Sequence, residues 1–458
     1  MPSTPDQLQP DTRRALLHRL ATGQVQGRAP SVVAAVVRDG RAVWVDGWGT
    51  VDGNAPDGDL QYRIGSITKT FVAVLVMRLR DEGRLALTDP LSEYLPGTVA
   101  GQATVGALLA HTAGLASEAT GPWWERTPGA LRPELTDVLG PDSQVHLAGR
   151  RYHYSNPGFA LLGALVQRVR GQAWGEVLRQ EVLEPLDLTR TTEQPVAPHA
   201  TGWAVHPWAD VLLAEPAVDT GLMAPAGQLW STATDLARFA AFLVDGDEKV
   251  LRPQTLAQMR TPASPPEVTT WDVGYGLGLK VLHRDGRLLA GHNGSMPGFL
   301  SALWIDTDQA LGAVVLGNAT AGLAAEALAT DLLRTVAERE PRIPPPWRPL
   351  PSVDTDLLEL TGPWYWGPAP FGLRVQAEGF VELTALSGAG AGFRFQPTGD
   401  GAWVGINGYF AGERLEVRRD AAGAVSHLDL GTYVLTRRPY DPTAPVPGGV
   451  DPAGWQPG

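Results

Sequence analysis

Arg63-Ile64-Gly65-Ser66-Ile67-Thr68-Lys69-Thr70 opens a helical pattern in this chain. The apolar residues that follow recur with helical period up to Arg80, and Gly83 supplies a stop, so a helix is predicted from Ser66 to Arg80. Side chains three residues apart on a helix are surface neighbours. The Ser66 hydroxyl and the Lys69 amine are therefore expected to meet.

Lys69 is an unusual choice in this chain, because almost every other basic residue is an arginine and the remaining lysines are Lys249 and Lys280. An arginine keeps its proton near neutral pH, whereas a lysine amine can release it when its surroundings disfavour the charge. Lys69 can thus act as a base toward Ser66, and the unpaired N–H groups at the helix start can stabilise an oxyanion. The alternative is a capping serine followed by a solvated lysine.

A second polar motif, Tyr154-Ser155-Asn156, precedes Pro157 and a helix predicted over residues 159–169. Because proline fits a first helical turn, the motif is expected just outside the helix, where its side chains can reach a cleft. A phenol can relay protons, and an asparagine amide can donate to a substrate carbonyl. The alternative is a half-buried tyrosine beside an N-cap asparagine.

The third motif, Gly291-His292-Asn293-Gly294-Ser295, is expected between a strand over residues 288–290 and a strand over residues 299–305. Gly294 can let substrate backbone approach closely, and the Ser295 N–H can supply a second oxyanion donor. The alternative is a glycine-rich hairpin turn with an incidental histidine.

Taken in order, Ser66-x-x-Lys69, Tyr154-x-Asn156 and His292-x-Gly294 resemble the three active-site motifs of the β-lactamase-related serine hydrolases. That family includes class C β-lactamases, D,D-carboxypeptidases, D-aminopeptidases and family VIII carboxylesterases. Supporting similarity lies in LLAHTAGL at 108–115, PAGQLWST at 225–232 and GYGLG at 274–278.

The resemblance implies a role for each matching residue. Ser66 would be acylated, Lys69 and Tyr154 would share the proton transfers, and Asn156 would position the substrate amide or ester. The backbone N–H groups of Ser66 and Ser295 would form the oxyanion hole. The resemblance also implies an α+β fold of the β-lactamase/penicillin-binding-protein type, with an antiparallel sheet flanked by helices and a mainly helical lobe.

His292 departs from the pattern of the β-lactamases, where this position is commonly a lysine whose cation helps to hold the substrate carboxylate. A histidine can be largely neutral at pH 7. The departure favours ester or peptide substrates over penicillins, and His292 is expected to orient an uncharged carbonyl. His111, in contrast, lies among leucines and is expected to be a packed, hydrogen-bonded residue without a part in the chemistry.

Other catalytic chemistries lack their sequence signatures. No serine lies in a Gly-x-Ser-x-Gly nucleophile elbow. There is no His-Glu-x-x-His, the histidines are scattered and cysteine is absent, so no zinc site is expected. The glycines at 274–278 and 388–392 lack the helix and acidic partner of a dinucleotide site. Neither a metal nor another cofactor is expected.

The composition limits the partners and the compartment. A formal net charge of −12 disfavours nucleic acid and anionic membranes, because a negative surface repels phosphate. No apolar stretch approaches the roughly 18 residues of a membrane span, and the N-terminus shows no signal peptide. The expected partner is a small-molecule or short-peptide substrate, and the absence of cysteine fits a cytoplasmic location.

At 458 residues the chain is long enough for two domains. Residues 1–340 are expected to form the hydrolase domain, with helices over residues 11–20 and 323–337 and strands over residues 31–37, 41–48, 275–282, 288–290, 299–305 and 311–316. Tryptophans at 123–124 and 203–208 either wall an acyl pocket or anchor loops.

Repeated prolines predict a stiff linker over residues 341–352. Residues 353–440 then show short alternating runs separated by glycine, which predict a small β-barrel or sandwich with strands over 372–376, 380–383, 393–396, 402–406, 414–418 and 433–436. This module could cover the cleft, bind a ligand inside the barrel or mediate association. Residues 441–458 are expected to be a disordered tail.

The hypothesis that unites these features is a serine hydrolase that acts through an acyl-enzyme on a small ester, amide or D-amino-acid peptide. One alternative is a β-lactamase or penicillin-binding protein. The other is a non-catalytic, ligand-binding relative that uses the C-terminal β module.

Overall fold

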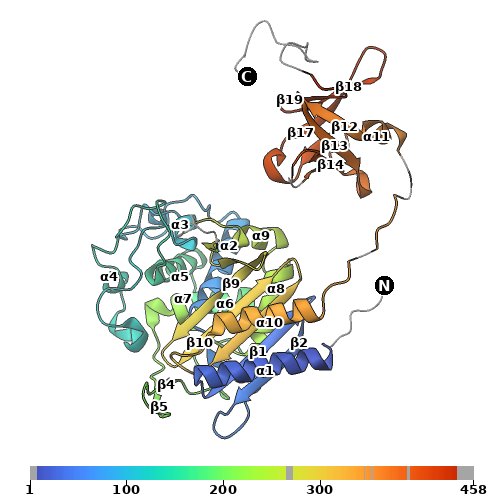
Figure 1. Cartoon of the computed structure of the whole chain (residues 1–458). Helices are drawn as coiled ribbons and strands as arrows, with labels where there is room; N and C mark the ends of the chain where they lie inside the picture. Colours follow the sequence, from blue (N-terminus) through green and yellow to red (C-terminus); the bar gives the residue numbers. More distant parts are fainter. Residues whose placement is uncertain are drawn as a thin grey trace. The chain divides into compact units, whose positions relative to one another are not determined.

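The chain divides into two compact units, residues 1–343 and residues 344–458, both drawn in Figure 1. The computed structural model describes residues 8–264, 272–344, 346–350, 352, 354–388 and 392–440, with the backbone alone at residue 378. The expected tail over residues 441–458 lies outside the described residues.

The first unit is built on a seven-stranded antiparallel sheet of order β2-β1-β11-β10-β9-β8-β7. An antiparallel sheet of this kind, closed by helices, was predicted, and this fold class is confirmed. Its strands are β1 (Ser31–Arg38), β2 (Arg41–Gly49), β7 (Val273–Tyr275), β8 (Lys280–Arg284), β9 (Arg287–Met296), β10 (Phe299–Asp306) and β11 (Leu311–Gly317).

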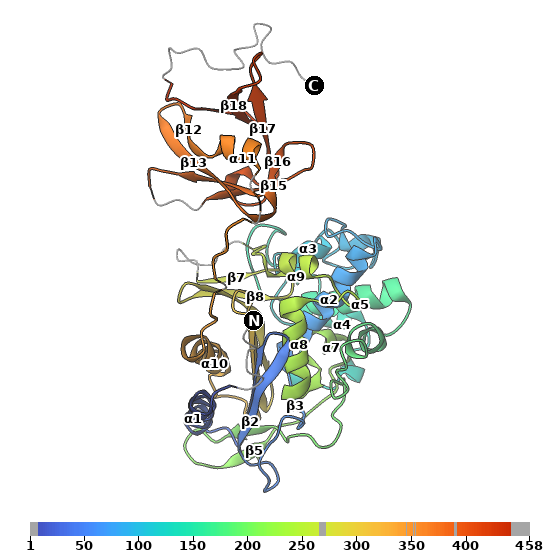
Figure 2. The ribbon, with the colours of Figure 1, turned by 90° about the vertical axis from the view of Figure 1, so that its right-hand side faces the viewer.

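Strand β1 is buried along its whole length, because helices cover both faces of the sheet. Successive side chains of a strand point to opposite faces. One set, represented by Val33, packs in a core with α2 and α8, and the other, represented by Val32, packs in a core with α1 and α10. Figure 2 shows α8 on one side of the sheet and both α1 and α10 on the other. The bounds are α1 (Pro10–Gly27), α2 (Thr68–Asp81), α8 (Ala233–Asp245) and α10 (Ala325–Arg339).

Helix α2 is buried on nearly all sides, which fits its almost continuous apolar sequence. Phe71 of α2 stacks on Phe239 of α8 with ring centroids 3.8 Å apart. Among the neighbours of α2 are α5 (Asn156–Arg170), α6 (Trp174–Leu178) and α7 (Ala224–Gly227). The first unit also contains α3 (Val105–Leu109), α4 (Leu135–Val138) and α9 (Pro253–Arg260). Two short strand pairs complete the unit: β3 (Tyr62–Arg63) with β6 (Trp230–Ser231), and β4 (Trp203–Val205) with β5 (Leu212–Ala214).

The strand predicted over residues 275–282 is broken in the structure, and this prediction is corrected. The chain leaves β7 and turns at Gly278, which has a φ of +75°, before β8 begins. A β-carbon at Gly278 would collide with the side chain of Ala73 in α2, and the Gly278 carbonyl accepts from Thr70 Oγ1 at 3.0 Å. The turn therefore wraps around α2 and ties it to the sheet.

The second unit is a closed barrel of eight strands, which confirms the predicted C-terminal β-barrel. Its interior is filled by apolar side chains, among them Trp364 and Phe395, so the described residues leave the barrel packed rather than hollow. Two strands of the barrel were not predicted. β12 carries Pro363, which argues against a strand, and β18 has the polar residues Ser426, His427 and Asp429 among its six. The elements are α11 (Thr355–Leu360), β12 (Gly362–Trp366), β13 (Ala369–Val375), β14 (Val381–Ala385), β15 (Phe393–Pro397), β16 (Trp403–Gly405), β17 (Arg414–Arg419), β18 (Val425–Leu430) and β19 (Tyr433–Thr436).

Candidate active site

Ser66 lies in a single 3-10 turn, η1 (Gly65–Ile67), that leads directly into α2. Lys69 stands in the first turn of α2, and its Nζ donates to Ser66 Oγ at 2.9 Å. The same Nζ donates to the carbonyl of Ala226 at 2.6 Å. Lys69 is fully buried, whereas Ser66 is partly exposed. The Lys69 amine and the Ser66 hydroxyl are therefore in contact as predicted, and Ser66 is the more accessible of the two.

Burial lowers the pKa of Lys69 to about 7. The carboxylates of Glu118 and, to a smaller extent, Glu125 oppose this by raising the pKa. A charged amine out of contact with water is costly, so the neutral form is favoured. A large share of the Lys69 amine is therefore unprotonated near neutral pH. In that form it can accept the proton of the Ser66 hydroxyl.

Tyr154 precedes α5 and lies against the same lysine. The Lys69 Nζ is 5.0 Å from the centroid of the Tyr154 ring, and the phenol shares a hydrogen bond with the Ser66 side chain. Burial raises the pKa of Tyr154 far above its usual value. The hydroxyl is thus a neutral phenol, which can accept a proton and pass its own proton on in one step.

Asn156 is the first residue of α5, one position further into the helix than predicted. The N-cap is Ser155, whose Oγ accepts from the Gly158 N–H at 3.1 Å. The Asn156 Nδ2 donates to Glu118 Oε1 at 3.0 Å, and Glu118 Oε2 accepts from Trp124 Nε1 at 2.7 Å. Glu118 was not predicted as a site residue, because it belongs to no spaced motif.

Strand β9 continues past the end of its pairing with β8, and this later part of β9 lies against η1. The ladder between β8 and β9 ends at the pair Lys280 and Gly291. Further along β9, a β-carbon on Gly65 would lie only 2.5 Å from the backbone nitrogen of Ser295. Gly65 has a φ of +52°, a conformation that favours glycine. The backbones on either side of Ser66 and at Ser295 are therefore brought together.

The third motif is part of β9 itself, and the two-residue turn follows later, at Pro297 and Gly298. This corrects its predicted place between two strands. Gly294 is predicted to let substrate backbone approach closely, and it is also needed within the protein, because a β-carbon there would collide with the carbonyl of Ile64. The absence of a side chain at Gly294 makes room for the protein's own backbone next to the serine turn.

His292 is predicted to orient an uncharged substrate carbonyl, and in the structure both of its ring nitrogens have partners within the protein. Its Nδ1 lies 2.6 Å from the Asn293 carbonyl, which fixes the proton there, and its Nε2 lies 3.1 Å from the Tyr275 hydroxyl. The ring is buried, and burial lowers the pKa of His292 to about 3. His292 is therefore a neutral side chain whose two nitrogens are occupied within the protein.

A family model described as "Beta-lactamase" matches residues 14–338. The chain belongs to the β-lactamase family. The resemblance drawn from the three motifs is thereby confirmed, and the match covers most of the first unit. A second model, described as a domain of unknown function (DUF7586), matches residues 353–437, the span of the barrel.

Relatives of this member of the β-lactamase family include penicillin-binding protein 4 of Amycolatopsis lactamdurans, 29% identical over 335 residues, which span 68% of this chain and 86% of that protein. A solved D-stereospecific amidohydrolase from Streptomyces sp. is 26% identical, with a TM-score of 0.58, over 72% of this chain and 99% of that one. The octameric penicillin-binding protein homologue from Pyrococcus abyssi has a TM-score of 0.65 at 21% identity, over 93% of this chain and 99% of that one, and shows similarity of fold.

Behind Lys69 and Tyr154, this β-lactamase-family site is lined by buried rings that were not predicted to belong to it. The His111 ring packs at a tilt against Tyr154, with ring centroids 4.2 Å apart, and edge to face against Tyr275, with ring centroids 4.6 Å apart. Its Nδ1 accepts from the Ser155 N–H at 3.0 Å, which agrees with a packed, hydrogen-bonded residue. Together with the His292 bond, these contacts hold Tyr154 in place from behind.

One of the tryptophan segments borders the site. Trp124 is buried. A β-carbon placed on Gly227 would lie 3.6 Å from the edge of the Trp124 ring and close to the backbone of Gly65, so Trp124 lies near the serine turn. A hollow of about 270 Å³ opens here, lined by residues of the segment 118–125. Trp203 belongs instead to the β4–β5 hairpin, and Trp208 is almost fully exposed.

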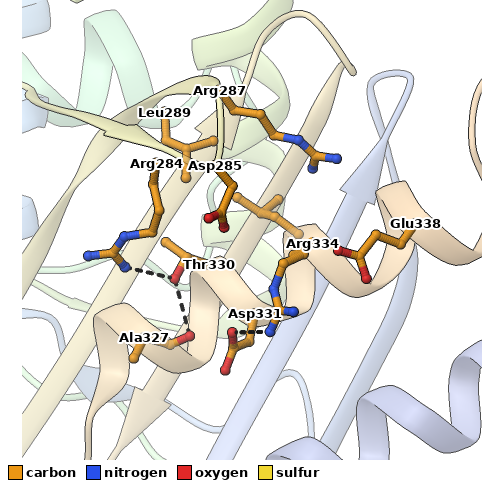
Figure 3. A pocket seen from close by; sticks show the side chains of 10 residues that line it. Arg284, Asp285, Arg287, Leu289, Ala327, Thr330, Asp331, Arg334 and Glu338 are labelled. Atoms are coloured by element: carbon orange, nitrogen blue, oxygen red, sulfur yellow. Dashed lines mark hydrogen bonds and ion pairs between the residues drawn. The ribbon is translucent and has the colours of Figure 1, made fainter. Parts of the chain in front are cut away.

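Another hollow, of about 340 Å³, lies between the β8–β9 turn and α10 (Figure 3). Leu289, which lines it, belongs to the core on the α10 face of the sheet, so this hollow is separate from the Ser66 site. Its polar side chains bond to one another: Arg284 donates to Thr330 at 3.3 Å, and Arg334 donates to Asp331 at 2.7 Å (Figure 3). These bonds indicate a structural role.

Within the described ranges, no three His, Cys, Asp or Glu side chains are grouped so as to hold a metal ion. The described helices include none with the length and apolar character to cross a membrane.

Proposed function

We propose that this member of the β-lactamase family is a serine hydrolase that forms an acyl-enzyme at Ser66 on a small ester, amide or D-amino-acid peptide. The observation that supports this most strongly is the 2.9 Å bond between Ser66 Oγ and a lysine that is fully buried and has a pKa of about 7. A nucleophile beside an amine that can lose its proton is the arrangement that covalent catalysis requires.

Acylation follows from these positions. The neutral Lys69 amine takes the proton of Ser66, whose oxygen attacks the carbonyl carbon of the substrate. The Ser66 and Ser295 N–H groups face the oxyanion that forms, since η1 and β9 bring these backbones together. As the tetrahedral intermediate collapses, the bond to the leaving group breaks, and Tyr154 gives that group a proton and takes one from Lys69.

Deacylation repeats the transfers with water as the nucleophile. Tyr154 and Lys69, which both lie at the Ser66 oxygen, accept the proton of the attacking water and return a proton to Ser66 as the acid leaves. Because burial keeps Tyr154 a neutral phenol, it acts as a relay, and Lys69 is the group that stores the proton.

The neutral His292 favours esters and amides over penicillins. A carboxylate-bearing substrate gains most from a cation at this position, and His292 is uncharged and bonded to Tyr275. The Streptomyces relative is named a D-stereospecific amidohydrolase, which supports an amide with a D-configured residue as the substrate class. The Amycolatopsis relative, a penicillin-binding protein, makes slow acylation by penicillin the second candidate.

Activity on an uncharged ester is expected to depend on pH through Lys69. Because the neutral amine is the active form, kcat/KM should be high above pH 7 and should fall as the pH drops through about 7. A pH profile of p-nitrophenyl acetate hydrolysis measures this. Glu125→Gln removes a charge that raises the pKa of Lys69, so its acid limb should move to lower pH. If the acid limb of the Glu125→Gln profile stayed at the wild-type pH, the titrating group would be a residue other than Lys69.

Hydrolysis of a panel of chromogenic substrates tests the proposed function. We expect measurable hydrolysis of p-nitrophenyl acetate and of a D-alanine p-nitroanilide, and slower hydrolysis of a chromogenic cephalosporin. The Ser66→Ala protein, which keeps Lys69 and Tyr154, should hydrolyse none of them above background. Full activity in Ser66→Ala, or rapid turnover of the cephalosporin alone, would contradict the proposal.

A further inference from the structure

We infer that the proline-rich residues 441–458 of this chain dock on a row of three aromatic rings, Trp366, Tyr409 and Tyr433, at the surface of the C-terminal barrel. This interaction goes beyond the proposed function, because it concerns the second unit and no step at Ser66. Three features support it: the exposure of the rings, the position of the chain where it leaves the barrel, and the chemistry of proline-rich strands.

The three rings come from separate segments of the barrel and lie next to one another. Trp366 ends β12, Tyr409 lies in the 3-10 turn η8 (Gly408–Phe410), and Tyr433 begins β19. The centroid of the Tyr433 ring lies 5.0 Å from that of Trp366 and 6.1 Å from that of Tyr409. Phe410, which is buried in the barrel core, packs against Tyr433 at 5.4 Å between centroids. The core therefore holds the row in place.

The outer faces of these rings are open to solvent. Trp366 is 47% exposed and Tyr409 is 73% exposed. Adjacent exposed rings indicate a binding surface, because a partner that covers them removes apolar area from water. The hydroxyls of Tyr409 and Tyr433 share a hydrogen bond, which leaves one O–H free to donate to another acceptor. The row therefore suits a ligand with apolar faces and exposed carbonyl groups.

The chain that follows β19 returns to this surface. The Tyr440 N–H donates to the Gly367 carbonyl at 3.2 Å, and the Tyr440 hydroxyl donates to the Val434 carbonyl at 3.0 Å. Gly367 directly follows Trp366 in the chain, and Val434 directly follows Tyr433. The segment after Tyr440 therefore starts next to the residues that carry two of the three rings.

The composition of residues 441–458 matches such a surface. The segment contains five prolines, the first three being Pro442, Pro445 and Pro447. Prolines favour the polyproline II helix, whose backbone carbonyls are free to accept hydrogen bonds, and aromatic-lined grooves bind such strands. At about 3.1 Å per residue, a polyproline II strand from Pro442 to Pro447 would span about 16 Å, enough to cross the row. The linker is also rich in proline, but most of it is described and it leaves the rings exposed.

Attachment to the barrel makes a weak interaction sufficient. A short tether holds a ligand at an effective concentration in the millimolar range. If the free segment binds with a Kd of about 0.1 mM, the attached segment occupies the rings for about 90% of the time. The same peptide added in solution then has to compete, which weakens its apparent affinity about tenfold.

Fluorescence anisotropy with a fluorescein-labelled synthetic peptide of residues 441–458 tests this competition. A chain that ends at Tyr440 should bind the peptide with a Kd of about 0.1 mM, and the full-length chain should bind it about tenfold more weakly. In the shortened chain, Tyr409→Ala and Trp366→Ala should each weaken binding about tenfold or more, because central aromatic contacts supply most of the binding energy. A peptide with alanine in place of its first three prolines should bind as weakly.

Trp208→Ala in the shortened chain is the matched control. Trp208 is 90% exposed and belongs to the first unit, so its loss removes an exposed ring without changing the barrel. This variant should bind the peptide as tightly as the shortened chain itself. Matching thermal unfolding of the variants shows that a loss of binding is not a loss of fold.

Equal affinity of the full-length and shortened chains for the peptide would overturn the inference, because the attached segment would then leave the rings free. A shortened chain that binds no peptide would overturn it as well. In either case, a dimer of the full-length chain in sedimentation that Tyr409→Ala dissociates would assign the rings to a second copy. These measurements use no substrate, so their failure leaves the proposed function intact.

Discussion

Replacing Lys69 by methionine is expected to lower kcat/KM for an uncharged ester about a thousandfold, because general base catalysis is lost. Methionine has a similar length and suits the buried surroundings of Lys69, so the fold should persist. Steady-state kinetics with p-nitrophenyl acetate at pH 8 measures the loss.

Two further variants show whether the amine or its charge matters. Lys69→Arg keeps a cation but cannot release the proton, so it should be as inactive as the methionine variant. Lys280→Met is the matched control, because Lys280 is partly exposed and pairs with Glu326 at 3.5 Å on the sheet. It should keep near-wild-type activity. An active Lys69→Arg protein would contradict the assignment of Lys69 as the base.

Replacing Gly65 by alanine is expected to lower kcat/KM about a hundredfold, the size of effect seen when an oxyanion donor is lost. The new β-carbon would lie 2.5 Å from the Ser295 nitrogen, so either η1 or β9 must move. The φ of +52° adds strain for any residue with a β-carbon. The same kinetic assay, with thermal unfolding, separates activity from stability.

Gly83→Ala is the matched control for this variant. Gly83 has a φ of +70°, and a β-carbon there would meet no atom within 4 Å. It shares the backbone strain of Gly65 without the collision, so it should lose stability, by about 1 kcal/mol, and keep its activity. If Gly65→Ala remained fully active, the backbone at Ser295 would not be part of the site.

The local patterns of the chain predicted most of its elements. The spacing of Ser66 and Lys69 placed both groups on one helix turn, and the structure joins them at 2.9 Å. The hairpin of β1 and β2 was predicted from two strand-like runs joined by Asp39 and Gly40, a strong hairpin signal. These features are determined by residues close in sequence, which is why a sequence pattern can show them.

Contacts between distant segments could not be predicted in this way. Tyr275 bonds to His292, and Glu118 bonds to Asn156 38 residues away. The break at Gly278 depends on Ala73 in another element, although the local alternation favoured one continuous strand. Likewise, the need for a glycine at position 294 comes from the backbone of Ile64, which is distant in sequence. Each of these depends on tertiary packing, which overrides local preference.

Peptide mass spectrometry after incubation with a fluorophosphonate tests the central claim most directly, since this reagent bonds covalently to an activated serine oxygen. We predict one adduct per chain, on the peptide that contains Ser66, and none in the Ser66→Ala protein. Labelling should slow markedly in Lys69→Met, because the base that activates the oxygen is gone. A folded wild-type protein that gains no adduct, or gains it at another serine, would contradict the account.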